Sequence, residues 1–227
     1  MGAVAINDVK KQTIIRRKVI QWFEDHGRSF AWRNTTNPYH ILIAEMLLRR
    51  TTATAVSKVY NSFLSQFNNP TRLAQTREST IAHVISSLGL QSVRARQLKK
   101  TASIICKSYS GKVPISYAEL ISLPGVGVYI ASAVRNFAFG ESIPLVDGNV
   151  VYFISRVFGI KYRGPTDSDA RDFMTHFGGE EQNAKLYWGI IDLVATVCFR
   201  RNSRCHICPL SELCTSSKTG DRINEDT

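Results

Sequence analysis

The sequence predicts an all-α protein, and two observations support this prediction. Apolar residues recur with helical spacing in segments that cover most of the chain. No segment shows the alternation of apolar and polar residues that marks a half-buried strand, and no internal repeat is present. The 227 residues, 44% of them hydrophobic, are enough to bury the core of one large or two small domains.

The first half of the chain divides into helices at residues that break helices. Gly27 follows the first helix, Asn68-Asn69-Pro70 follows the third, and Gly89 precedes the last. We expect the residues before the first helix, 1–10, to be a loose tail, and Trp32 to anchor the core. The expected helices cover residues 11–26, 39–49, 53–67, 71–75, 79–88 and 94–109.

The second half begins at a break marked by Pro114. Gly140 ends one of its helices, and Gly164-Pro165 marks a loop. We expect residues 220–227 to be frayed. The expected helices cover residues 116–123, 128–139, 150–158, 169–177 and 183–198.

The charge balance favours a polyanionic partner. Lys and Arg number 29 against 18 Asp and Glu, a formal charge of +11. The alternative is a protein that is merely basic. No apolar run approaches the ~20 residues of a membrane span, and the N-terminus lacks the apolar core of a signal peptide. We therefore expect a cytoplasmic protein whose five cysteines are not in disulfides.

Two glycines stand two positions apart in the segment LPGVGVY, which joins the helices expected over residues 116–123 and 128–139. Gly125 and Gly127 let the backbone turn tightly and expose consecutive amides at a helix N-terminus. Such amides suit a phosphate oxygen. The alternative is an ordinary corner between two helices.

Glu45 lies inside the apolar run of the helix expected over residues 39–49. A carboxylate in these surroundings needs a partner, a proton or a task. A position on the wet side of the helix is the alternative, but Leu42, Met46 and Leu48 are spaced around it. The helix ends in Arg49-Arg50-Thr51-Thr52, which suits a DNA-facing loop and a solvated helix end alike.

Asp147 and Asn149 precede the helix expected over residues 150–158. A helix N-terminus favours the ionised form of an acid placed there. Asp147 is therefore either a helix cap alone or an acid held ready for chemistry.

Four cysteines lie within 17 residues, with the spacing C-x6-C-x2-C-x5-C. Four thiolates so close can surround one metal centre, either zinc or an iron–sulfur cluster. Only one C-x2-C pair is present, whereas structural zinc sites often use two. Cys106 stands apart, and we expect it to be a buried apolar residue. The four candidate ligands are Cys198, Cys205, Cys208 and Cys214, with His206 as a weaker candidate.

Three motifs together resemble the helix-hairpin-helix DNA glycosylase superfamily, which includes endonuclease III and the adenine mismatch glycosylases. They are LPGVGVYIASAV at 123–134, VDGNV at 146–150 and the cysteines at 198–214. The resemblance implies two helical domains flanking a DNA-binding groove. Residues 32–140 would form a six-helix barrel with the helix-hairpin-helix. Residues 1–31 and 141–227 would form a domain whose four cysteines hold a [4Fe–4S] cluster, which favours iron–sulfur over zinc.

The resemblance also assigns roles to single residues. Asp147 falls on the catalytic aspartate, whose carboxylate can stabilise the oxocarbenium-like sugar as the glycosidic bond breaks. Members that also cut the DNA strand carry a lysine at position 129, which forms a Schiff base with the sugar. Tyr129 has no amine, so we expect base removal without strand cleavage.

The choice of base rests on positions 45, 49–50 and 129. Adenine-removing relatives share a glutamate at position 45, but they usually have a glutamine pair at 49–50, a serine at 129 and an additional C-terminal domain. The run ILIAEMLLRRTT with Tyr129 resembles the thymine/uracil mismatch glycosylases, which act on G:T and G:U pairs. The resemblance places Arg50 in the gap that the flipped base leaves.

We therefore expect a monofunctional G:T or G:U mismatch DNA glycosylase, with an adenine glycosylase as the alternative. A DNA-structure-binding protein without catalysis is disfavoured by the intact Asp147, and an iron–sulfur electron carrier by the basic charge. The expected partner is mismatched double-stranded DNA, bound by a monomer in the prokaryotic nucleoid, without membrane association. The expected catalytic residues are Asp147, Tyr129 and Glu45. The expected DNA contacts are Arg49, Arg50, Leu123, Gly125, Val126, Gly127 and Val128.

Overall fold

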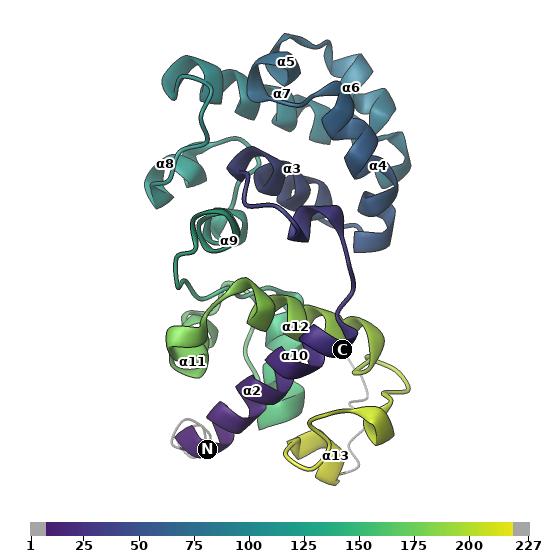
Figure 1. The fold of residues 1–227 in the computed structure, drawn as a ribbon, viewed down its shortest axis with the longest axis vertical. Coiled ribbons are helices and arrows are strands. Elements are labelled where there is room, and N and C mark those ends of the chain that lie inside the picture. The colour runs from purple at the N-terminus through teal and green to yellow at the C-terminus, as the bar shows by residue number, and fades with distance from the viewer. Residues whose placement is uncertain (1–7, 220–227) are drawn as a thin grey trace. The chain divides into compact units, whose positions relative to one another are not determined.

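The computed structural model describes residues 8–219, which form α-helices and short 3₁₀ helices without a strand (Figure 1). This confirms the all-α prediction. The chain divides into two compact units: Ser29–Glu141, and the residues up to 28 together with those from 142 onward. None of the helices in the described part is long and apolar enough to cross a membrane.

The unit Ser29–Glu141 is built around α3, most of whose residues are buried. This helix packs against α4, α7 and α9 (Figure 1). It begins at Asn37, whose Oδ1 accepts hydrogen bonds from the amides of Tyr39 and His40 at 2.9 and 3.3 Å. The elements are η1 (Ala31–Arg33), α3 (Pro38–Leu48), α4 (Ala53–Gln66), α5 (Pro70–Gln75), α6 (Glu78–Val84), η2 (Ser86–Leu88), α7 (Gln91–Ser108), α8 (Tyr117–Ser122) and α9 (Val128–Phe139).

Trp32 anchors the core of this unit, as predicted. Its side chain is only 5% exposed, stacks on Phe30 and meets the ring of Tyr60 edge-on. Cys106 departs from its prediction because it is half-buried rather than buried. Its sulfur lies 3.6 Å from Oγ1 of Thr71, where α5 packs against α7.

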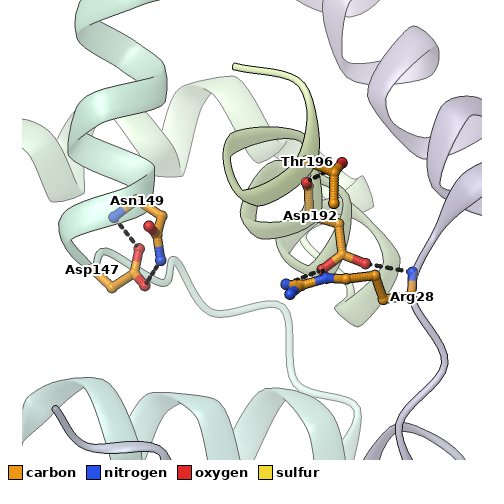
Figure 2. A network of polar contacts seen from close by, with 5 residues as sticks. All are labelled: Arg28, Asp147, Asn149, Asp192 and Thr196. Carbon is orange, nitrogen blue, oxygen red and sulfur yellow. Dashed lines mark hydrogen bonds and ion pairs between the residues drawn. The ribbon is translucent and has the colours of Figure 1, made fainter. Parts of the chain in front are cut away.

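The second unit packs α2 closely along α12. Gly189 permits this approach, since a Cβ there would lie 2.8 Å from Cγ1 of Val19 and 3.0 Å from its carbonyl oxygen. Just after α2, Arg28 donates three hydrogen bonds to the buried carboxylate of Asp192 on α12 (Figure 2). The elements are α2 (Val9–His26), α10 (Gly148–Phe158), α11 (Ser168–Gly178), η3 (Gly179–Glu181), α12 (Ala184–Thr196), η4 (Cys205–Ile207) and α13 (Thr215–Thr219).

A few helix limits differ from those expected. The expected loose tail is wrong for Val9 and Lys10, which belong to α2 because Asp8 caps that helix through the Lys11 amide. The helix expected over residues 79–88 is two elements, α6 and η2, and α13 was not expected. Residues 1–7 and 220–227, where loose ends were also expected, lie outside the described residues.

Candidate functional site

The glycine hairpin connects α8 to α9 and leaves the N-terminus of α9 without a side-chain cap. Gly125 has φ of +83°, a left-handed conformation that favours glycine. The next glycine, Gly127, is the N-cap of α9 and supplies no side-chain acceptor for the amides of the first turn. Leu123 and Val126 are buried and fix the hairpin to the unit, while Val128 is 39% exposed. The helix N-terminus therefore offers amides and a positive dipole end to a ligand.

The loop after α3 lies against this hairpin. Nη1 of Arg49 donates to Oε1 of Gln97 at 2.9 Å and to the carbonyl oxygen of Gly125 at 3.2 Å. Arg50 is exposed and has φ of +50°, an uncommon backbone conformation for a residue with a side chain. Arg49 is thus engaged with the hairpin, whereas Arg50 projects into solvent.

Glu45 is buried in α3, at 6% exposure, which excludes the solvated alternative. It lies one turn before Arg49, at the end of α3 that leads to the arginine loop. Tyr129 is half-buried in the first turn of α9. The unit Ser29–Glu141 therefore carries Glu45, Tyr129 and all the residues expected to contact DNA.

Asp147, in the other unit, is the N-cap of α10 (Figure 2). Its Oδ1 accepts from the amides of Asn149 and Val150 at 2.9 and 2.8 Å, and its Oδ2 accepts from Nδ2 of Asn149 at 2.9 Å. Part of its surface is exposed, yet desolvation by the surrounding protein raises the pKa of the carboxyl. The hydrogen bonds oppose this shift by lowering the pKa. The net shift is upward, so burial outweighs the helix N-terminus that was expected to favour the ionised form. When ionised, the carboxylate is fixed in orientation and poorly hydrated, which suits it to stabilising nearby positive charge.

The four clustered cysteines line one cavity in the same unit, together with Arg156. Burial first, and then the other three sulfurs, raise the pKa of the Cys208 thiol to about 11, against the lowering effect of a hydrogen bond from the Leu210 amide. A thiolate at such a site therefore needs a metal centre to hold it in the ionised form. Within residues 8–219, no three His, Cys, Asp or Glu side chains converge on a point where they could share one metal ion.

The contacts of several residues near these sites were not expected from the sequence. Asn149 holds Oδ2 of Asp147, and its place two residues after an N-cap aspartate was the available signal. On α7, Gln97 accepts a hydrogen bond from Arg49, and Thr101 donates one to the carbonyl oxygen of Pro124. Arg94 belongs to a helix rich in cationic residues, but it is only 6% exposed.

Comparisons with known proteins identify the family to which this fold and these motifs belong. The family model described as "HhH-GPD superfamily base excision DNA repair protein" matches residues 43–176. The thymine-DNA glycosylase of Aeropyrum pernix is 38% identical over 88% of this chain and 92% of its own length. The thymine/uracil-DNA glycosylase of Methanothermobacter thermautotrophicus is 35% identical over 91% of this chain and 94% of its own. An adenine DNA glycosylase of Buchnera aphidicola is 31% identical over 89% of this chain but only 58% of its own length.

Among solved structures, a thermostable thymine-DNA glycosylase superposes with a TM-score of 0.87 at 33% identity, covering 92% of this chain and 98% of that chain. A trapped covalent intermediate of endonuclease III with DNA superposes with a TM-score of 0.81 at 25% identity, over 92% and 98% of the two chains. The matched residues include the glycine hairpin and Asp147. The chain belongs to the HhH-GPD superfamily of base excision DNA repair proteins.

Proposed function

We propose that this chain is a monofunctional DNA glycosylase that removes thymine or uracil mispaired with guanine. Such pairs arise when 5-methylcytosine or cytosine is deaminated. The observation that carries the proposal is the fixed, poorly hydrated carboxylate of Asp147, in a chain 38% identical to a thymine-DNA glycosylase.

Asp147 is the proposed catalytic carboxylate. Breaking the N-glycosidic bond leaves positive charge on the sugar, and the target base must first leave the stack to be reached. A carboxylate whose two oxygens are held by the Asn149 and Val150 amides and by the Asn149 side chain needs little reorganisation as that charge develops. Asn149 acts here as a positioning residue.

Tyr129 determines what happens to the sugar. A phenol cannot form an imine, so the proposed reaction is hydrolysis that leaves the abasic site intact. Glu45, the remaining proposed catalytic residue, is buried in α3, next to the loop that carries Arg50.

The proposed DNA contacts divide into two groups. The hairpin, Leu123–Val128, presents the uncapped N-terminus of α9 to a phosphate. The exposed Arg50 enters the gap left by the flipped base and donates to the guanine that remains. The proposed partner is mismatched double-stranded DNA, which the protein binds as a monomer.

The cysteine cavity is the proposed site of a [4Fe–4S] cluster. In such a cluster each thiolate binds a different iron, so the four sulfurs surround a volume rather than converge on one ion. A cavity lined by Cys198, Cys205, Cys208 and Cys214 offers four thiolates in this arrangement. Protein prepared without oxygen should contain about four irons per chain, and one zinc with no iron would exclude the cluster.

An adenine glycosylase is the second candidate, and the buried Glu45 favours it. Adenine glycosylases in this superfamily carry a glutamate there, which can protonate the purine. Arg49-Arg50 and Tyr129 depart from the pattern of those relatives.

One assay separates the two candidates. Duplexes holding G:T, G:U, G:A and 8-oxoguanine:A are incubated with the protein, and the products are resolved with and without alkali. Strand breaks that appear only after alkali, in G:T and G:U duplexes, support the proposal. Breaks in the G:A or 8-oxoguanine:A duplex alone would contradict the proposal and support an adenine glycosylase instead.

A further inference from the structure

We propose that α7 carries three positioning residues, Arg94, Gln97 and Thr101, which hold the Arg50 loop and the glycine hairpin in one fixed arrangement. This inference rests on the proposed function, because it concerns the two segments that the proposal brings to DNA. The three residues are spaced by three and four positions, so they share one face of α7.

Arg94 holds the C-terminal end of α3. Its guanidinium donates to the carbonyl oxygens of Met46 and Leu47 at 3.3 and 3.1 Å, and to that of Arg49. Its Nε also donates to the carbonyl oxygen of Gly89 at 3.0 Å. The last carbonyls of a helix have no partner within the helix, and a cation beside them is favoured by the helix dipole. A buried arginine therefore fixes the point where the chain leaves α3.

The consequence of this contact falls on Arg50. Arg94 binds the carbonyl of Arg49, the peptide group that leads directly into Arg50. Arg50 holds a left-handed backbone conformation that costs energy for a residue with a side chain. Such a conformation persists only when its surroundings impose it, and Arg94 supplies part of that constraint.

Gln97 and Thr101 extend the same support to the hairpin. Arg49 bridges Oε1 of Gln97 and the carbonyl oxygen of Gly125, so the arginine loop and the hairpin share one hydrogen-bonded link. Oγ1 of Thr101 donates to the carbonyl oxygen of Pro124 at 2.7 Å, from a side chain that is 2% exposed. A Cβ on Gly125 would lie 2.9 Å from Oε1 of Gln97, so the two elements fit without spare room.

The arrangement thus fixes two DNA-contacting segments relative to each other from one rigid helix. The hairpin would bind a phosphate while Arg50 enters the stack, and the two events need a defined spacing. We expect loss of this support to weaken DNA binding through Arg50, not through the fold.

A double-mutant cycle tests this expectation. Affinity for a G:T duplex is measured in an Asp147→Asn background, so that no base is released, with Arg94→Met, Arg50→Ala and both together. Arg94→Met alone should weaken binding about tenfold, the effect of losing hydrogen bonds from a charged donor. In protein that already carries Arg50→Ala, Arg94→Met should lower the affinity by a further factor of less than about three, because the residue that Arg94 positions is gone.

A matched control is Arg72→Met, since Arg72 also donates to a main-chain carbonyl, that of Gln66, in the same unit. It removes the same charge and should leave affinity within about twofold of the parent. Equal losses from Arg94→Met in both backgrounds would overturn the positioning role, as would unchanged affinity.

A second pair of variants covers the case in which Arg94→Met fails to fold. Thr101→Val keeps the shape but frees the Pro124 carbonyl, and should weaken binding about threefold. Thr101→Ser restores the donor and should return affinity to the parent value. Equal affinities of the Thr101→Val and Thr101→Ser variants would show that the Thr101 hydroxyl does not position the hairpin. Because binding is measured directly, failure of the proposed function would appear separately, as the absence of base release by the parent protein from any duplex.

Discussion

At the scale of single residues, the sequence position of Asp147 left two alternatives, a helix cap and an acid held ready for chemistry, and the proposed function combines them. It caps α10 through the amides of Asn149 and Val150, and it keeps a carboxyl whose pKa is raised by desolvation. A cap alone needs only a hydrogen-bond acceptor, which asparagine also provides. What asparagine lacks is the full negative charge, so the two roles can be separated by experiment.

The Asp147→Asn variant should lose excision while keeping its fold and its affinity for DNA. The loss should be on the order of 100-fold or more, as for removal of one preorganised electrostatic group. Single-turnover release of thymine from a G:T duplex measures the rate, and titration with the same duplex measures affinity. Excision within a few-fold of the parent would remove Asp147 from the mechanism.

The same variant should be more stable than the parent at neutral pH. Because the folded-state pKa of Asp147 lies above its ordinary value of 3.8, the folded state holds this proton more tightly than the unfolded state does. Its contribution to stability is complete below that ordinary value and is lost as pH rises through the folded-state pKa. The gain in the free energy of unfolding should therefore appear near neutral pH and vanish in acid, with urea titrations at both values as the measurement. A gain independent of pH would contradict this cause.

The Tyr129→Lys variant should acquire strand cleavage. An amine in the first turn of α9, at a half-buried position, can form the Schiff base that a phenol cannot. Its partial burial lowers the pKa of the new amine and raises the fraction of nucleophile. Borohydride should trap a covalent DNA adduct with the variant only. Equal trapping of the parent would show that another lysine already acts as a lyase.

At the scale of elements, the two hairpin glycines have different physical reasons for being glycine. Gly125 needs its left-handed backbone and has Gln97 and Arg49 close to the Cβ position. Gly127 has ordinary φ, and a Cβ there would meet nothing within 4 Å. No contact within the described residues requires a glycine at 127, and the proposed function supplies a reason, the close approach of a phosphate.

The Gly127→Ala variant should therefore keep the stability of the parent but bind DNA about tenfold more weakly, as for one lost hydrogen bond to a charged group. Gly125→Ala, in contrast, should lower the free energy of unfolding. Thermal melts and titrations of both variants with one duplex make the comparison. Parental DNA affinity in a folded Gly127→Ala variant would show that no phosphate approaches this turn.

The pair formed by Arg28 and Asp192 predicts a large stability effect at the junction of α2 and α12. Asp192 is fully buried, so Asp192→Ala leaves the Arg28 guanidinium without its carboxylate and should cost about 3–5 kcal/mol. Lys185 and Glu24 link the same two helices but are largely exposed, and Glu24→Gln should cost about 1 kcal/mol or less. Urea unfolding measures both, and similar losses would contradict the role of burial.

Periodicity and breakers predicted most helices to within a few residues because each helix buries an apolar face and stops at a glycine, proline or cap. They failed at residues 79–88, where helical spacing continues but the backbone tightens into η2 before Gly89. They also missed the role of Arg94, because a buried arginine and a solvated one look alike in a cationic helix. Its acceptors are main-chain carbonyls of α3, which no side-chain pattern reveals.

At the scale of the whole molecule, the net charge of +11 sets how the protein meets DNA. Lysine and arginine side chains that neutralise phosphates release counterions. The logarithm of the binding constant should therefore fall linearly with the logarithm of the salt concentration. The slope should be about −0.9 for each phosphate neutralised. Base-specific contacts, such as those proposed for Arg50, are made to neutral base edges rather than to phosphates.

This difference predicts that plots of log affinity against log salt concentration are parallel for mismatched and fully paired DNA. A G:T duplex and the fully paired G:C duplex should show the same salt slope, because the hairpin and the lysine and arginine side chains meet the same phosphates in each. The affinity for the G:T duplex should exceed that for the G:C duplex by a constant factor, which reflects the contacts with the flipped base and with the guanine left unpaired. Fluorescence anisotropy with Asp147→Asn protein, over a range of potassium chloride concentrations, gives both slopes and the offset. Affinity unchanged by salt would exclude phosphate contacts as the main source of binding. A slope that differs between the duplexes would instead mean that the mismatch changes how many phosphates the protein touches.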